Sequence, residues 1–428
     1  MTLNIDSIAG WGARLAETSA RVNAGYPGEG PSRQPVSTVY GGAQLFAATT
    51  PAKLGELALT FADRWASTPG DLAVILGLHP VLADRVHPAV LEKLTREPVE
   101  DFRIDFEDGY GHRPDEEEDG HAVATAEQVA LGMESGSLPP FIGIRIKTLS
   151  AELHRRSLRT LDLFVSTVVE KAGALPAGFC VTVPKLQDVE QVRVIVEVLD
   201  ELERGLGIDP IPIELMVETP QMIVDRDGST GVRRWVEAAG GRVRGAHFGT
   251  YDYTASLNIT AAYQSMDHPA CDFARHVQQV SLAGTGVWIS DGATNVMPVG
   301  DDANVVGDAM RLHYEHIRHS LSHAYYQGWD LHPAQLVTRY AAVYAFFLEG
   351  LDAAGSRLSN FVQSAAKATL VGEVFDDAAT GQGLLNYFLR AVACGAITED
   401  EAISRTGLTV PELRTRSFLR IMESRRST

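Results

Sequence analysis

Polar and ionisable residues end or follow a series of short apolar runs in the middle of the chain. They are Asp105, Glu107, Asp108, Arg145, Lys185, Glu218, His247, Tyr251, Asp252 and His332. Carboxylates can hold a hard divalent cation or move protons, and an arginine can bind an anionic oxygen. If one fold brings these side chains together, they predict catalysis on a small acidic molecule.

The apolar runs are regularly spaced. They begin at Phe102, Phe141, Phe179, Ile213, Val243, Gly286 and Gly328. Successive starts lie about 30 to 43 residues apart, close to the length of a strand-plus-helix unit. Segments with helical periodicity lie between the runs, and such alternation predicts a parallel sheet. A strand near Val36–Tyr40 completes a set of eight, although the apolar run from Leu72 competes for that place.

Eight such repeats predict an α/β fold, a (β/α)8 TIM barrel formed by residues 37–340. We expect residues 1–36 to form an N-terminal arm, with a helix and then a loop rich in Gly and Pro. Residues 341–428 are expected to form a C-terminal appendage of helices only. Because Ile144 and Ile146 share one strand face, alternation turns Arg145 toward the barrel lumen. In barrels, reactive groups lie at the carboxyl ends of the strands, and the polar residues named above stand at those ends.

Composition excludes several classes of protein. The formal net charge is −18 and no basic stripe stands out, which argues against a nucleic-acid binder. No run of 18 apolar residues predicts a membrane span, and the first residues lack the pattern of a secretory signal. The three cysteines form no CxxC pair, which favours a reducing compartment such as the cytoplasm.

The order of the motifs resembles the HpcH/HpaI aldolase/citrate lyase beta-subunit family, within the phosphoenolpyruvate/pyruvate-binding barrels. That family follows the cues D-x-E-D, Arg, P-K, E-T/S, G-x-x-D and H-P-x-Q on successive strands. In this chain they are Asp105-Phe106-Glu107-Asp108, Arg145, Pro184-Lys185, Glu218-Thr219, Gly249-Thr250-Tyr251-Asp252 and His332-Pro333-Ala334-Gln335. The resemblance extends over roughly residues 100–340. Three features depart from the pattern. The segment between Gly41 and Asp101 is longer and lacks the usual phosphate- or coenzyme A-loop signature, an acidic insert follows Asp108, and the helical tail is long.

The resemblance implies a metal-dependent carbon–carbon lyase or aldolase that acts through an enolate. Mg²⁺, or Mn²⁺, would be held by Glu218 and Asp252, and Arg145 would bind the enolate oxygen. Glu107 and Asp108 are candidate catalytic residues beside Arg145, as is Lys185, for which a Schiff base is the alternative role. The candidate substrate-binding residues are Asp105, Tyr251, His247 and His332.

The expected partner is a small acidic substrate, either a 2-oxo acid or a coenzyme A thioester, and the resemblance implies a homo-oligomer. Two other functions stay open, a malate-synthase-like or phosphoenolpyruvate-type transfer and a catalytically idle barrel that binds ligands. Each histidine has an ordinary alternative too, since His247 and His332 are as readily explained as core residues bonded to the backbone. The helical spacing of His313, His316, His319 and His323 favours an amphipathic face over a metal cluster.

Overall fold

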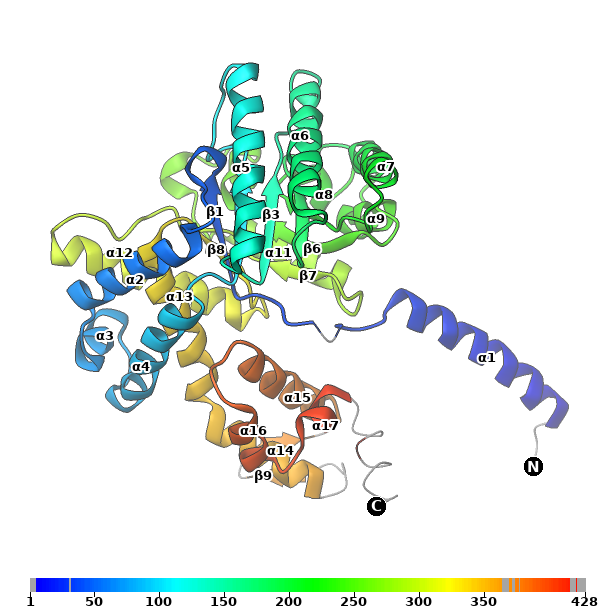
Figure 1. The fold of residues 1–428 in the computed structure, drawn as a ribbon. Helices are drawn as coiled ribbons and strands as arrows, with labels where there is room; N and C mark the ends of the chain where they lie inside the picture. Colours follow the sequence, from blue (N-terminus) through cyan, green and yellow to red (C-terminus); the bar gives the residue numbers. More distant parts are fainter. Residues whose placement is uncertain are drawn as a thin grey trace. The chain divides into compact units, whose positions relative to one another are not determined.

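The computed structural model describes residues 5–30, 32–363, 369–371, 374–376, 378–415 and 421. Its eight-stranded sheet is the predicted (β/α)8 barrel (Figure 1). The strands are β1 (Ser37–Gly42), β2 (Asp101–Asp105), β3 (Phe141–Arg145), β4 (Phe179–Val183), β5 (Ile213–Val217), β6 (Val243–Phe248), β7 (Trp288–Ser290) and β8 (Gly328–Asp330). The strand order is β7-β6-β5-β4-β3-β2-β1-β8. A parallel bridge between Ala293 and Trp329 joins the segment after β7 to β8.

Helices separate the strands and extend both ends of the chain (Figure 1). Before β4 they are α1 (Ile5–Gly25), α2 (Thr50–Trp65), α3 (Pro69–Leu76), α4 (Pro80–Arg96), α5 (Asp115–Ser135) and α6 (His154–Ala172). From β4 to β8 they are α7 (Val189–Leu206), α8 (Pro220–Ile223), α9 (Gly231–Ala238), α10 (Thr250–Ser256), α11 (Pro269–Leu282) and α12 (Ala303–Ser322). After β8 follow α13 (Pro333–Glu349), α14 (Leu351–Gln363), α15 (Ala378–Ala393), α16 (Glu399–Thr406) and α17 (Val410–Thr415).

Local sequence signals explain where these elements begin and end. Asp188 caps α7 in a reciprocal pair with Gln191, and Gly207 ends the helix in the left-handed conformation. In β3, Ile142 and Ile144 are fully buried, as expected for the strand face that packs against helices. The strand near residue 36 is confirmed, whereas the competing run from Leu72 lies in α3.

The C-terminal expectation of helices only is wrong. A short antiparallel hairpin of β9 (Thr369–Val371) and β10 (Val374–Asp376) lies between α14 and α15. Register pairs Val374 with Val371 and Asp376 with Thr369. The expected boundary at residue 340 lies inside α13, which continues to Glu349.

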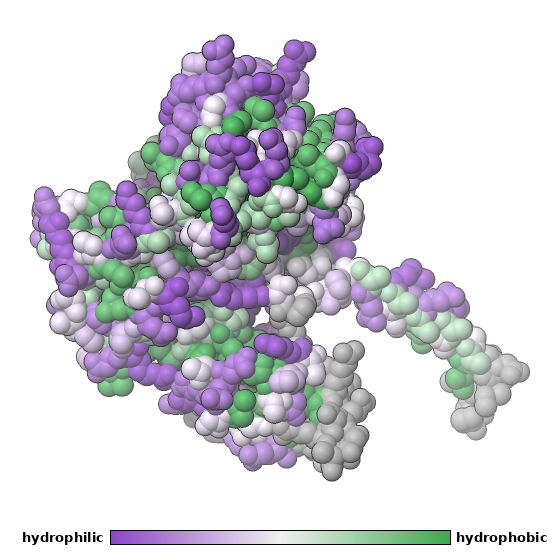
Figure 2. Space-filling model, viewed as in Figure 1, coloured by the Kyte–Doolittle hydropathy of each residue, from purple (hydrophilic) through white to green (hydrophobic). Residues whose placement is uncertain are grey.

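The chain divides into two compact units, which are described separately below. The first comprises Met1–Ser32, Ile146–Arg159 and Cys180–Ser290, and the second comprises Arg33–Arg145, Thr160–Phe179 and Asp291–Thr428. In the first unit, the side chains of α1 from Ile8 to Ala24 are all exposed. Figure 2 shows hydrophobic and hydrophilic residues side by side along this helix. Among the described helices, no single one is long and apolar enough to cross a membrane.

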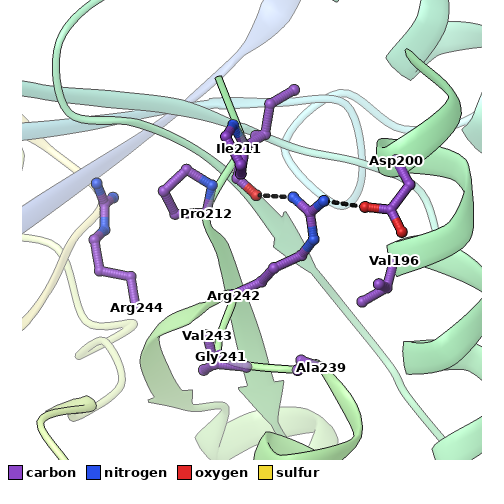
Figure 3. A pocket seen from close by; sticks show the side chains of 11 residues that line it. Val196, Asp200, Ile211, Pro212, Ala239, Gly241, Arg242, Val243 and Arg244 are labelled. Carbon is purple, nitrogen blue, oxygen red and sulfur yellow. Dashed lines mark hydrogen bonds and ion pairs between the residues drawn. The ribbon is translucent and has the colours of Figure 1, made fainter. Parts of the chain in front are cut away.

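The first unit contains a pocket of about 690 Å³ near the amino ends of β5 and β6 (Figure 3). Its charged lining residues are Asp200, Arg242 and Arg244. Arg242 donates to the carbonyl oxygen of Ile211 and to the carboxylates of Asp200 and Glu203. Both oxygens of the buried Glu203 carboxylate receive a bond from Arg242, at 2.6 Å each. The positive charge of Arg242 is balanced by the carboxylates beside it. The pocket lies at the amino ends of the strands, the end of a barrel that is associated with stability, so we assign the pocket a structural role.

Replacing Arg242 by Gln should therefore destabilise the protein. The change leaves the Glu203 carboxylate buried with its charge uncompensated, which typically costs about 3 kcal/mol. The free energy of unfolding, measured by urea denaturation, should fall by that amount. The matched control is Arg193→Gln, because the exposed Arg193 pairs with Glu190 on the surface of α7 and should cost no more than about 0.5 kcal/mol. Equal losses in the two variants would contradict the structural role.

A buried polar cluster in the second unit holds β8. Arg339 donates to both oxygens of Asp330, and Ser37 Oγ donates to Asp330 Oδ2 at 2.6 Å. His313 Nε2 lies 3.1 Å from Asp330 Oδ1, and both side chains are almost fully buried. Burial lowers the pKa of His313 in spite of Asp330, so the ring is neutral in the folded protein.

This lowered pKa predicts a pH-dependent stability. The unfolded chain has a histidine pKa of about 6.5, so below that pH it takes up a proton that folded His313 resists. The free energy of unfolding should therefore not depend on His313 protonation above that pH, and it should decline as the pH falls below it. The urea midpoint of the wild type should therefore drop between about pH 8 and about pH 5.5 more steeply than that of His313→Gln. The control is His79→Gln, an exposed position, which should keep the wild-type dependence of the urea midpoint on pH. The same dependence in His313→Gln would show that His313 is not the group responsible.

Candidate functional site

In the second unit, Arg145 at the end of β3 is clamped by Asp105 at the end of β2. Register places the two residues opposite each other. Arg145 Nε donates to Asp105 Oδ1 at 2.7 Å, and Nη2 donates to Asp105 Oδ2 at 2.5 Å. The backbone N–H groups of Glu107 and Gly109 donate to the same two oxygens at 2.9 and 2.7 Å. Four donors fill the acceptor capacity of a carboxylate, which favours an orienting role for Asp105 over the predicted contact with substrate.

The remaining terminal nitrogen of Arg145 points toward two further carboxylates. Nη1 lies 3.4 Å from Glu107 Oε2 and 3.9 Å from Asp108 Oδ2. No hydrogen bond donated by Nη1 is found in the part of the chain that the structure describes. Glu107 is nearly buried, whereas the Asp108 side chain is 55% exposed. Asp105, Glu107, Asp108 and Arg145 form what we call the arginine group.

The charge of Arg145 is secured by its surroundings. Burial alone would lower the pKa of the guanidinium, but Asp105, by its charge and hydrogen bonds, and Glu107 raise it well above its ordinary value. A permanently charged donor held in a low-dielectric setting is suited to stabilising an oxyanion. The arginine group can therefore bind one anionic oxygen through Nη1.

In the first unit, Lys185 joins two carboxylates. Its backbone N–H donates to Glu218 Oε1 at 2.5 Å, and its Nζ lies 3.6 Å from Asp252 Oδ1. Lys185 has a φ of 50°, a left-handed conformation that is uncommon outside glycine. The Thr219 hydroxyl, which donates to the carbonyl oxygen of Leu186 at 2.6 Å, fastens the same turn to the end of β5. Lys185, Glu218 and Asp252 form what we call the lysine group.

Gly249, the residue before α10, makes room for the Glu218 carboxylate. A Cβ at position 249 would lie 2.4 Å from Glu218 Oε2 and 2.6 Å from Glu218 Cβ. Glu218 is buried, while Asp252 stands in the first turn of α10 with its side chain 40% exposed. A glycine is thus required beside Glu218 for steric reasons, which sequence spacing alone did not reveal.

The lysine group has the donor chemistry that Mg²⁺ or Mn²⁺ prefers. Both carboxylates are oxygen donors, and Mg²⁺ is commonly bound by one or two carboxylates with water filling the other positions. Among the described residues, no cluster of three or more histidine, cysteine, aspartate or glutamate side chains could hold a metal. A site built from Glu218 and Asp252 with water and substrate oxygens fits these residues, and the metal role stays a prediction.

His247, a predicted substrate contact, is almost fully buried. The ring is 1% exposed, and Nε2 lies 3.1 Å from Glu214 Oε2. Glu214 also accepts from Arg244 Nη2 at 3.0 Å and from the Thr182 hydroxyl at 3.1 Å. These contacts on β4, β5 and β6 favour a structural role for His247 within the first unit.

His332 and Tyr251, the other two predicted substrate contacts, begin or lie in helices. His332 Nδ1 accepts the backbone N–H of Ala334 at 3.2 Å, so the ring caps α13. Burial lowers the pKa of His332, which keeps the ring neutral. Tyr251 is partly exposed in the first turn of α10, next to Asp252. Both contacts with substrate remain predictions.

Two aromatic residues beside the arginine group were missed. The Tyr40 ring lies under the guanidinium of Arg145, with Cζ 5.0 Å from the ring centroid. The ring of Trp329 packs on Tyr40 at a centroid distance of 4.5 Å. The alternation of β1 places Tyr40 on the same face as Gly42, which pairs with Asp105. That signal is visible in the sequence only once the register of β1 and β2 is known.

One solved structure shows the same fold. A citrate lyase from Burkholderia xenovorans LB400 is similar at a TM-score of 0.59 and 20% identity, over 88% of this chain and 97% of that chain. A malate synthase from Haloferax volcanii aligns at a TM-score of 0.49 and 13% identity, over 91% of this chain and 98% of that chain. At such identity the likeness to the citrate lyase shows the barrel fold and no more.

The resemblance to the HpcH/HpaI aldolase/citrate lyase beta-subunit family, drawn from the motifs, stays a prediction. No curated protein matches the chain. One family model does match, and its description is "Domain of unknown function (DUF6986)". Since that match extends over residues 15–421, the chain belongs to this family.

Proposed function

We propose that this protein is a metal-dependent carbon–carbon lyase or aldolase that acts through the enolate of a 2-oxo acid or of an acyl thioester. The observation that carries the proposal is the clamped guanidinium of Arg145. Asp105 holds its Nε and Nη2 edge, which leaves Nη1 to meet an oxygen. Such a preorganised cation stabilises charge that develops in the transition state without reorganisation.

The lysine group supplies the second part of the proposal. Glu218 and Asp252 would hold Mg²⁺ or Mn²⁺, which acts as a Lewis acid on a carbonyl oxygen when bound. Glu218 is oriented by the Lys185 N–H and by the space at Gly249. The Lys185 ammonium beside Asp252 adds a positive charge that favours an acidic substrate. Both groups follow the carboxyl ends of parallel strands, where barrel enzymes carry their reactive residues.

Glu107 is the residue best placed to move a proton in this scheme. Its carboxylate lies 3.4 Å from Arg145 Nη1, so it stands beside the position assigned to the enolate oxygen. The Asp108 backbone N–H donates to Glu107 Oε2 at 3.0 Å, which helps to orient the carboxylate. In the cleavage direction Glu107 would take the proton of the hydroxyl group, while the electron pair of the breaking carbon–carbon bond passes into the enolate. In the reverse direction it would return that proton to the new alkoxide.

The experiment is a product assay with purified protein, Mg²⁺ or Mn²⁺, and a panel of 4-hydroxy-2-oxo acids and 3-hydroxyacyl coenzyme A thioesters. Release of pyruvate, glyoxylate or acetyl-CoA from one of them is the expected result. Net condensation of glyoxylate with acetyl-CoA, with no cleavage of any panel member, would favour the transferase alternative. Ligand binding without turnover of any panel member would favour the idle barrel.

We also propose a homo-oligomer that works in a reducing compartment such as the cytoplasm. The three cysteines are buried and free, which agrees with a reducing environment. The exposed apolar residues of α1, among them Trp11 and Leu15, leave surface for contacts between copies. Light scattering at micromolar concentration should show a species larger than the monomer, and a single monomer peak would refute the oligomer.

A further inference from the structure

We propose that Tyr40, supported by Trp329, is a positioning residue that fixes the plane of the Arg145 guanidinium. The inference rests on the proposed function for its meaning, since Arg145 is there the ligand of the enolate oxygen. Tyr40 on β1 and Trp329 on β8 both lie in the second unit, and neither belongs to the motifs described above.

Hydrogen bonds along one edge of a guanidinium do not fix the orientation of its plane. Asp105 fixes the Nε and Nη2 edge of Arg145, at 2.7 and 2.5 Å. Rotation about that edge would swing Nη1 out of the plane and away from a bound oxygen. The surface of an aromatic ring under the guanidinium carbon opposes this rotation through a cation–π contact.

Tyr40 provides that surface. It stands on β1 opposite Arg103 of β2, two residues before Gly42, which faces Asp105. The guanidinium of Arg145 lies 5.0 Å from its ring centroid, within the range of a cation–π contact. Tyr40 is only 8% exposed, and a desolvated contact of this kind is stronger than a contact on the surface.

Trp329, on β8, packs against the Tyr40 ring; β8 pairs with β1 on the side opposite β2. The two rings are 4.5 Å apart at an angle of 34°. Trp329 lies on β8, where Arg339 Nη2 donates to its carbonyl oxygen at 3.1 Å and its own N–H donates to Gly292 O at 3.2 Å. The adjacent Asp330 is held by Arg339 and Ser37. The support of the guanidinium therefore extends from β8 through β1 to β3.

Gly42 and Gly109 complete this arrangement. A Cβ at Gly42 would lie 2.4 Å from the carbonyl oxygen of Gly109, and a Cβ at Gly109 would lie 2.7 Å from Asp105 Oδ2. The end of β1 and the loop after β2 thus approach each other as closely as backbone allows. This contact fixes β1, and with it Tyr40, relative to the carboxylate that binds Arg145.

The test compares Tyr40→Leu with Tyr40→Phe, because Phe keeps the aromatic face and Leu does not. The first readout is independent of any substrate. An α-dicarbonyl reagent such as phenylglyoxal condenses with the terminal nitrogens of a guanidinium, and the labelling rate of Arg145 is followed by peptide mass spectrometry. We expect Tyr40→Leu to label about tenfold faster than wild type, the change that corresponds to a desolvated cation–π contact. Tyr40→Phe should label at the wild-type rate.

Phe46→Leu is the control for lost packing. Phe46 is similarly buried in the same unit, but its ring packs against Phe102. Arg145 should label at the wild-type rate in this variant. Equal labelling in Tyr40→Leu and Phe46→Leu, or faster labelling in Tyr40→Phe as well, would overturn the proposal.

The second readout uses the reaction identified by the product assay. Tyr40→Leu should lower kcat about tenfold while KM changes little, since the lost contact orients Arg145 rather than binding substrate. Tyr40→Phe should keep the wild-type kcat. If no variant, wild type included, turns over any substrate, the proposed function fails while the labelling rates still decide the role of Tyr40.

Discussion

Arg145→Lys should reduce kcat/KM by about 10²–10³-fold while the protein stays folded, since loss of one oxyanion donor has an effect of that size. Arg145 uses two nitrogens on Asp105 and has a third that points toward Glu107 and Asp108. A lysine has one nitrogen on a flexible stem, so it cannot remain bound to Asp105 and also reach a substrate oxygen in a fixed direction. Steady-state kinetics, with circular dichroism to verify folding, measure the effect.

The control for this variant is Arg193→Lys. Arg193 is half-exposed on α7 and pairs with Glu190, so its replacement should leave kcat/KM unchanged. A folded Arg145→Lys protein with nearly normal turnover would show that the guanidinium does not contact the reacting atoms.

Glu218→Gln should abolish measurable turnover and weaken Mn²⁺ binding. Gln keeps the size of the side chain and an oxygen that can accept the Lys185 N–H, so the fold is expected to survive. It removes one of the two negative charges assigned to the metal, and metal Lewis-acid catalysis is worth several kcal/mol, which corresponds to about 10³-fold or more in rate. Electron paramagnetic resonance of free Mn²⁺ measures the affinity, and added metal should restore little activity.

Glu190→Gln serves as the matched control, because Glu190 is an exposed carboxylate on α7 that pairs only with surface groups in the structure as described. It should bind Mn²⁺ as the wild type does. If Glu218→Gln retains wild-type affinity for Mn²⁺, the metal is held elsewhere and the role of the lysine group must be reassigned.

The barrel could be predicted because its sequence repeats a simple physical pattern. Runs such as FIGIR are buried on both faces in a parallel sheet, so they appear as apolar segments at regular intervals. The helix α3 was ambiguous for the same reason, since a short apolar run such as LAVIL is compatible with a strand or a buried helix. The capping pair of Thr68 and Asp71 at its start was the signal that resolves the ambiguity.

The site was only partly predictable, because the role of a side chain depends on its neighbours across strands. Strand position alone placed Asp105 and Arg145 at the carboxyl ends of their strands. The register and the loop after β2 decide that Asp105 has four donors around it. His247 stands on a strand next to that of Glu214, and its ring is buried 3.1 Å from the Glu214 carboxylate. Tyr40 carries no motif, since aromatic residues are common in strands.

Deuterium exchange at the carbon next to a substrate carbonyl tests the central claim most directly. The protein is mixed in D₂O with Mg²⁺ and either pyruvate or acetyl-CoA, and loss of the methyl proton signal is followed by NMR. The account predicts exchange with one of these two compounds well above the rate without protein, lost in Arg145→Lys and on removal of the metal with a chelator. Exchange that persists in Arg145→Lys or in the presence of chelator, or no exchange with either compound, would contradict enolate formation at these residues.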